Sequence, residues 1–173
     1  GAFGIVCYYT PFIFMMGNSI VQSAQPIVSY SYGNGAYDRV RKARSLMMKV
    51  SVLFGLGVTL VFVLFPEMLV ALFIDASCGA GVLAVRGMPL FASGFVFFVI
   101  NICVVGYYQS VERVVPATAV MLLRGVVLLL PCFLLLPILI GEPGIWLATP
   151  LAEMVTTVLI VVYLLYKKMR GNR

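Results

Sequence analysis

Five long apolar stretches alternate with short polar connections along the chain. Each stretch is long enough for a helix of about 20 residues, which crosses the roughly 30 Å hydrocarbon core of a bilayer. Within that core the backbone cannot bond to water, so apolar stretches of this length favour helices. The sequence therefore predicts an all-α membrane protein with five transmembrane helices. The expected spans are residues 3–30, 46–65, 82–107, 117–138 and 145–166.

Basic residues between these stretches predict the orientation. They gather after the first, third and fifth stretches, whereas the other two connections carry acidic residues. Lys and Arg favour the cytoplasmic side, and all three basic segments fall on that side if each stretch crosses once. The C-terminus is then expected to be cytoplasmic. The basic residues concerned are Arg39, Arg41, Lys42, Arg44, Arg113, Lys167, Lys168, Arg170 and Arg173, and Arg86 departs from the pattern.

Composition agrees with a membrane protein and excludes several functions. Of the 173 residues, 62% are hydrophobic and 10% are charged, whereas a soluble domain has roughly 25% charged residues. The net charge of +6 comes from short clusters between apolar stretches, so we expect no nucleic-acid partner. With no histidine and no clustered cysteines, we expect no metal site, no cofactor and no enzyme activity. The segment FPEMLVALFIDAS is too short to span and is expected to form a helix at the outer interface.

Polar residues inside the first stretch share one face of the expected helix. They recur at spacings of four, three and four positions, which places them on one stripe. Pro26 removes the backbone donor that would bond the Gln22 carbonyl, and this carbonyl then needs another partner or water. Two interpretations stay open: the stripe lines a cavity, or it bonds to another helix. The stripe consists of Asn18, Gln22, Gln25 and Ser29.

Two charged residues lie within the last two stretches, where a charge costs from about 2.5 kcal/mol upward. By a rise of about 1.5 Å per residue, Arg124 and Glu153 lie about 12 Å and about 20 Å from the inner ends of their spans. A long arginine side chain can bridge part of this offset if the two helix faces meet. Glu153 is either half of a structural ion pair or a titratable group on a transport pathway. Asn101 shares a stripe of the third span with Arg86 and Ser93.

Five segments, in the expected order, resemble the multidrug and toxic compound extrusion (MATE) family. The run QSAQPIVSYSYGNGAYDRVRKA is similar to a family signature in which a glutamine–proline pair leads into a turn and a basic loop. The segments FPEMLVALFID, GYYQSVERVVPA, LLRGVVLLLPCFLLLP and GIWLATPLAE resemble later parts of the family. The resemblance implies a twelve-helix, two-lobe transporter. Residues 1–173 are then expected to form helices 8–12 of its C-terminal lobe, with the N-terminal lobe as partner.

The resemblance also implies a function. Family members export organic, often cationic, compounds across the bacterial cytoplasmic membrane against an inward flow of Na⁺ or H⁺, by rocking of two lobes around a central cavity. In some relatives the helix that corresponds to residues 82–107 carries an acidic cation ligand, but here this range has no acidic residue. We therefore expect no identifiable site for the coupling ion in this chain, and no transport by this chain alone.

The expected site combines the polar stripe with the charges inside the membrane. Aromatic rings attract cations, so Tyr8, Phe97 and Tyr108 are additional candidates for contact with an organic cation. Two alternatives stay open: a flippase for lipid-linked saccharides, which needs a strongly basic cavity, and a membrane scaffold, whose polar stripe is buried against another helix. The residues expected to line the cavity are Asn18, Gln22, Gln25, Asn101 and Glu153, and the expected charge partner of Glu153 is Arg124.

Overall fold

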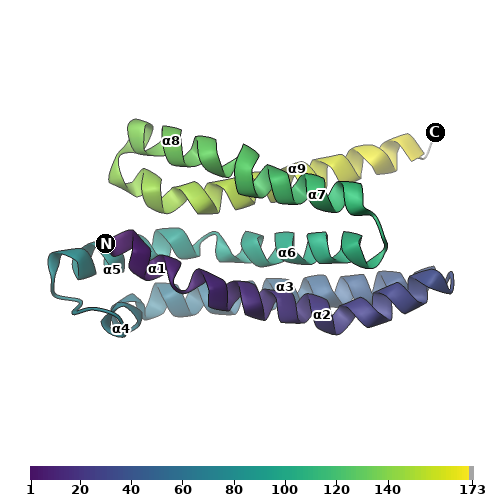
Figure 1. Ribbon diagram of the computed structural model, residues 1–173, viewed down its shortest axis with the longest axis horizontal. Coiled ribbons are helices and arrows are strands. Elements are labelled where there is room, and N and C mark those ends of the chain that lie inside the picture. The colour runs from purple at the N-terminus through teal and green to yellow at the C-terminus, as the bar shows by residue number, and fades with distance from the viewer. Residues whose placement is uncertain (172–173) are drawn as a thin grey trace.

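The computed structural model describes residues 1–171, and every secondary-structure element within them is a helix (Figure 1). The predicted basic residue Arg173 lies outside the described residues. The elements are α1 (Ala2–Cys7), α2 (Thr10–Gly33), α3 (Tyr37–Leu64), α4 (Pro66–Ala71), α5 (Gly79–Ala92), α6 (Phe95–Ser110), α7 (Val114–Leu122), the π-helix η1 (Leu123–Val127), α8 (Leu129–Ile140) and α9 (Glu142–Gly171).

Four of the helical segments are each long and apolar enough to cross a membrane, and the pair α5–α6 adds a fifth if it counts as one span. This pair is bent by 48° at its break. The predicted spans correspond to these five segments in order, and the all-α membrane fold is confirmed. The four unbroken segments are Ala2–Gly33, Tyr37–Leu64, Val114–Ile140 and Glu142–Arg170.

The predicted basic loop after the first span is in fact the first part of α3. This helix begins at Tyr37 and not near residue 46, the start of the apolar stretch. Asp38 lies in its first turn, where a negative charge stabilises the helix dipole, and Arg41 pairs with Asp38 at 2.7 Å. Apolarity therefore marks only the part of α3 suited to hydrocarbon, and the helix itself continues beyond that part.

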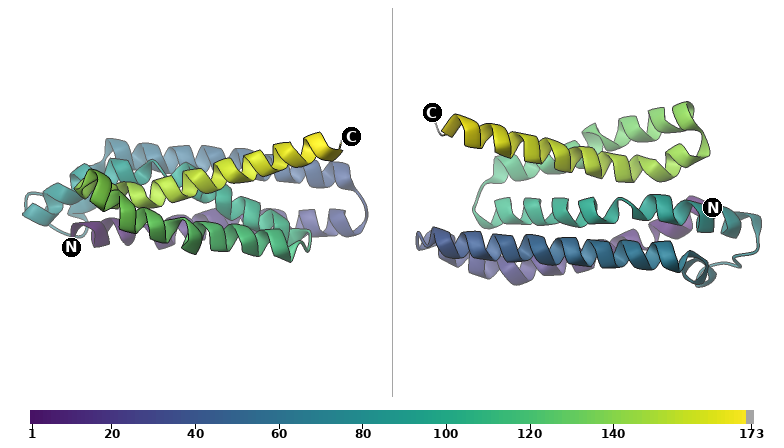
Figure 2. Two further views of the ribbon diagram at one scale, coloured as in Figure 1. Left: turned by 90° about the horizontal axis from the view of Figure 1, so that it is seen from above. Right: turned by 180° about the vertical axis from the view of Figure 1, so that it is seen from behind.

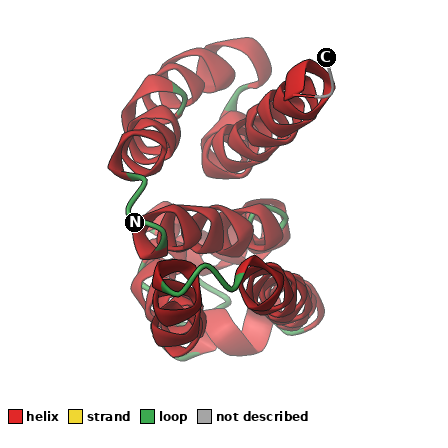
Figure 3. Ribbon diagram, turned by 90° about the vertical axis from the view of Figure 1, so that its right-hand side faces the viewer, coloured by secondary structure: helices red, strands yellow, loops and turns green. Residues whose placement is uncertain are grey.

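The helices form two layers (Figures 1 and 2). In the first, α2, α3 and α6 lie side by side, and in the second, α7, η1 and α8 lie beside α9, as the end view in Figure 3 shows. Interhelical hydrogen bonds connect the first layer, because Ser29 Oγ donates to the Ser110 carbonyl at 2.9 Å and Thr59 Oγ1 donates to the Ala92 carbonyl at 3.0 Å. Such bonds satisfy polar groups within an apolar bundle.

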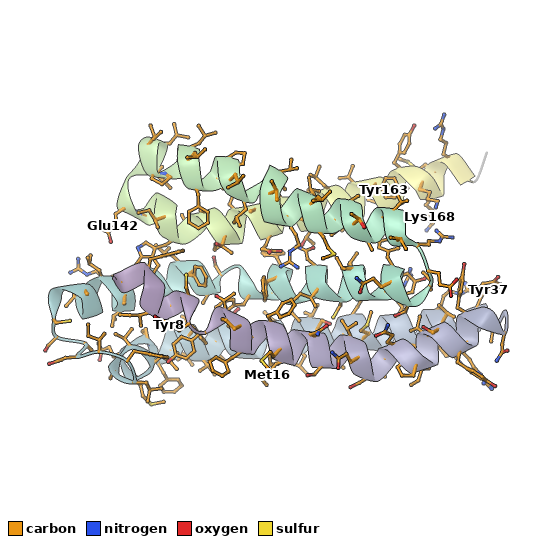
Figure 4. The ribbon with its side chains drawn as sticks, viewed as in Figure 1. Tyr8, Met16, Tyr37, Glu142, Tyr163 and Lys168 are labelled. Carbon is orange, nitrogen blue, oxygen red and sulfur yellow. The ribbon has the colours of Figure 1, made fainter. Side chains whose placement is uncertain are left out.

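The two ends of the bundle differ in charge. Figure 4 shows Tyr37, at the start of the basic part of α3, at the same end of the bundle as Lys168, with Glu142 at the opposite end. The basic connections predicted to share one side of the membrane therefore share one end of the fold.

Close contact between α9 and the α5–α6 break brings the two layers together. A Cβ atom on Gly94, at this break, would lie only 2.6 Å from Pro150 Cα in α9. Small residues at a helix interface permit this backbone approach. As a result, Glu153, about one turn after Pro150, lies against α6.

Candidate functional site

Glu153 is the centre of a charge network between α9, η1 and α6. The residue is 5% exposed. Its Oε1 accepts hydrogen bonds from Nε of Arg124 at 3.0 Å and from Nη2 of Arg124 at 2.6 Å. Its Oε2 accepts a hydrogen bond from Nδ2 of Asn101 at 2.7 Å. Both oxygens thus face donors, as those of an ionised carboxylate do, and charge-assisted bonds of this kind are among the strongest in proteins.

Asn101 holds the network from the α6 side. The residue is fully buried, and its Nδ2 also donates to the Glu153 carbonyl at 3.0 Å. A carbonyl only accepts hydrogen bonds, so this contact fixes which end of the amide faces α9. Thr157 Oγ1 then donates to Oδ1 of Asn101 at 3.0 Å. Every polar atom of the Asn101 side chain therefore has a partner.

Each helix that contributes to the network is irregular close to it. α5–α6 breaks at Gly94, and α9 contains Pro150. In η1, the Leu128 N–H donates to the Leu123 carbonyl at 2.9 Å, which is a π-type bond of five residues. Single π-turns are frequent at functional sites, and discontinuous helices build the binding sites of many transporters. These irregularities make the neighbourhood of Glu153 a candidate site independently of its charge.

A cavity of about 730 Å³ lies beside the ion pair, lined by residues of α1, α2, α5, α6, α7, η1, α8 and α9. Its walls are mainly aromatic. The Phe3 ring contacts the rings of Phe91 and Phe133 edge to face, with centroids 5.7 and 5.8 Å apart. The guanidinium carbon of Arg124 lies 4.8 Å from the Phe98 centroid, a cation–π contact. The lining phenylalanines are Phe3, Phe14, Phe91, Phe98 and Phe133.

The structure brings together three of the residues predicted for the site. Asn101, Arg124 and Glu153 form one hydrogen-bonded cluster, and the depth offset expected between the two charges does not prevent contact. Arg124 and Glu153 also line the cavity. Of the two interpretations for Arg124, pairing with Glu153 is therefore the one that the geometry shows.

The structure places the other predicted residues apart from this cluster. Gln22 and Gln25 are exposed and Asn18 is partly exposed, and within residues 1–171 none of the three side chains has a hydrogen-bond partner. By helical period they continue the face of α2 on which Thr10 and Phe14 line the cavity. Their role as cavity-lining residues stays a prediction.

The three predicted aromatic residues do not line this cavity. Tyr8 stacks on Phe73 with centroids 5.8 Å apart, on the side of the chain toward α4 (Figure 4). Phe97 and Tyr108 line two other, separate hollows on α6. The phenylalanines of the cavity were missed because phenylalanine is common in lipid-facing positions. One signal was available, since Phe98 and Thr149 lie three and four residues before Asn101 and Glu153, the spacing of one helical turn.

A multi-pass helical bundle with a charge network beside an aromatic cavity has the features of a membrane transporter. The comparisons with known proteins identify the family. The chain belongs to the MatE family, whose family model matches residues 1–134, and the resemblance predicted from the sequence motifs is confirmed.

Two solved structures are similar to the chain. One is described as the MATE multidrug transporter DinF-BH in complex with a small-molecule dye; it has 34% sequence identity and a TM-score of 0.81, with 95% of this chain and 36% of that chain covered. The other is described as the inward-facing conformation of a multidrug resistance MATE family transporter of the MOP superfamily. With 17% identity, a TM-score of 0.79 and coverage of 95% of this chain and 39% of that chain, it shows the same fold. A comparison with curated proteins found no match. The chain thus spans little more than a third of the length of these transporters.

Proposed function

We propose that this chain is the C-terminal part, helices 8–12, of a MATE antiporter that exports organic small molecules across the bacterial cytoplasmic membrane in exchange for Na⁺ or H⁺. Membership of the MatE family over residues 1–134 carries the proposal, together with the likeness to the multidrug transporter DinF-BH. That transporter was solved in complex with a small-molecule dye, which supports an organic small molecule as cargo. The basic end of the bundle, with the C-terminus, faces the cytoplasm.

The cavity beside Glu153 is proposed as part of the substrate pathway. It lies among discontinuous helices and has both aromatic and charged walls, which is the usual composition of a site for organic ligands. Residues 1–171 contain no group of three or more His, Cys, Asp or Glu side chains that would hold a metal ion. The coupling ion is accordingly proposed to bind with help from the N-terminal lobe.

One observation weighs against the flippase alternative. A cavity for pyrophosphate-linked saccharides needs several cationic groups, whereas Arg124 is the one basic residue among those that line this cavity within residues 1–171. Its charge is moreover paired with Glu153 at 2.6 Å.

The test is efflux by the complete protein, reconstituted in proteoliposomes, of a fluorescent organic dye under an imposed Na⁺ or proton gradient. Glu153→Gln removes the charge but keeps the size, and we expect the initial efflux rate to fall by about tenfold or more, since a charged contact is worth roughly 1.5–3 kcal/mol. Glu142→Gln, at the far end of the bundle, is the matched control and leaves the rate unchanged. Equal rates in all three proteins would contradict a role of this cavity in transport.

A further inference from the structure

The charge network beside the cavity leaves unused hydrogen-bond donors, and almost no unused acceptors. On Glu153, Oε1 accepts two bonds and Oε2 accepts one, out of about four lone-pair sites on a carboxylate. The side chain is 7% exposed. A ligand in the cavity therefore meets a carboxylate that is nearly saturated by protein donors.

Arg124 is in the opposite state. It uses its Nε–H and one N–H of Nη2 on Glu153, which leaves the other N–H of Nη2 and both N–H groups of Nη1 without an acceptor among the described residues. Its side chain is 14% exposed, twice the fraction of its partner, and it lines the cavity. Since desolvated guanidinium donors are costly to leave unbonded, the cavity favours a group that accepts from them.

Two hydroxyls extend this donor-rich wall. Thr10 lines the cavity, and its Oγ1 is the one buried side-chain polar atom within residues 1–171 that lacks a hydrogen-bond partner. Thr149 also lines the cavity, and its hydroxyl makes no hydrogen bond to any other described residue. Unlike the buried amide of Asn101, these groups retain their capacity to bond a ligand.

The rest of the cavity fits a flat apolar body. Phe3, Phe91 and Phe133 meet edge to face, so ring faces and edges are presented at fixed angles. Rings of this kind pack against an aromatic ligand by offset stacking or edge contact. A volume of about 730 Å³ lies within the usual range of small-molecule sites.

We propose that this cavity binds an aromatic carboxylate, with the rings of the ligand among the phenylalanines and its carboxylate on the free N–H groups of Arg124. A ligand whose only charge is cationic fits less well, because it meets Arg124 and cannot reach an open carboxylate. An aromatic zwitterion fits through its carboxylate end. The proposal deepens the proposed function by naming a substrate class, and it rests on that function only in treating the bound molecule as cargo.

The experiment compares three probes with the same ring system: 2-naphthoate, 2-naphthamide and N,N,N-trimethyl-2-naphthylammonium. The complete protein in lipid nanodiscs is treated with N-ethylmaleimide, and alkylation of Cys7, which lines the cavity, is followed by mass spectrometry at each probe concentration. Cys132 is the internal control, because it is similarly half-buried but does not line the cavity.

We expect 2-naphthoate to protect Cys7 at a concentration at least about tenfold lower than either other probe, since a charge-assisted bond accounts for roughly that factor. Cys132 is alkylated at the same rate throughout. In the double variant Arg124→Gln with Glu153→Gln, which removes both charges together, the preference falls to within about twofold. Arg113→Gln, an exposed arginine outside this cavity, keeps the preference. If the double variant does not fold, Arg124→Lys replaces it and reduces the preference several-fold, because lysine lacks the planar fork.

Stronger protection by the ammonium probe, protection by none of the probes, or a preference that survives in these variants would overturn the proposal. The proposed function fails differently. If Glu153→Gln leaves dye efflux unchanged while 2-naphthoate still protects Cys7, the ligand class stands and the transport role is lost. Loss of efflux without selective protection overturns the ligand class alone.

Discussion

Two polar regions of this bundle solve the same physical problem in opposite ways. Around Glu153, each polar atom of the Asn101 and Glu153 side chains bonds to a protein donor or acceptor, and both residues are buried. Along α2, Gln22 and Gln25 are exposed, and the described residues offer them no partner. Both regions lie in helices long and apolar enough to span a membrane.

The difference separates a polar group that is complete within this chain from one that is not. In hydrocarbon an unpaired amide is costly, so the α2 stripe requires water or a partner outside residues 1–171. The network at Glu153 requires neither, because α6, η1 and α9 supply its bonds. The stripe therefore marks an incomplete surface, and the network marks a preformed one.

The largest effect is expected from breaking the network on one side. Arg124→Met leaves a buried carboxylate without its counter-charge and should lower the free energy of unfolding by about 3–5 kcal/mol. Arg124→Met with Glu153→Met removes both charges and should recover most of that loss. The measurement is SDS-driven unfolding in mixed micelles. Equal losses in the single and double variants would show that the two residues act independently.

A smaller effect is expected from probing access to the stripe. Cysteine at Gln22 or Gln25 in the complete protein should react with a membrane-impermeant thiol reagent at least about tenfold faster than cysteine at Thr156, which is fully buried. Transported substrate should slow the reaction at the two stripe positions. No labelling of either position in any state would defeat their assignment to a cavity and would favour lipid or protein contact.

A smaller effect still is expected from removing a stripe amide. Gln22→Leu should change the free energy of unfolding by no more than about 0.6 kcal/mol, the mean value of a polar contact between membrane helices, because no described residue bonds to Gln22. Asn101→Leu in the same assay serves as the contrast and should cost several times more. A Gln22 variant as unstable as the Asn101 variant would place an unrecognised bond on the stripe.

The smallest effect concerns a polar group in water. Ser77 donates hydrogen bonds to Asp75 from its hydroxyl and its backbone N–H, and these bonds lower the pKa of that carboxyl below its usual value. Because the folded pKa is the lower one, the ionised form contributes stability above the unfolded pKa, and this contribution is lost as pH falls through the folded pKa. The stability difference between the native protein and Asp75→Asn should accordingly shrink between about pH 5 and pH 3. A difference that is constant over that range would contradict the assigned bonds.

Much of the fold follows from the sequence, because apolar length and the placement of Lys and Arg determine spans in a bilayer. Pairing of Arg124 with Glu153 was also within reach, since two opposite charges at similar depth have few other partners. The start of α3 at Tyr37 was missed because a helix can extend beyond its apolar part. The cavity was missed because its shape depends on the 48° break in α5–α6 and on η1, and neither is encoded in the periodicity of apolar residues.

The wide turn at Leu123–Val127 has a consequence for α8. It contains one residue more than a regular turn needs, so the two halves of this long rod have independent angular settings. Arg124 can point toward Glu153 while Phe133, nine positions later, still projects into the same hollow. Removal of one residue from the turn would rotate everything beyond it by about 100°, and the far half of the rod would then present a different side chain inward.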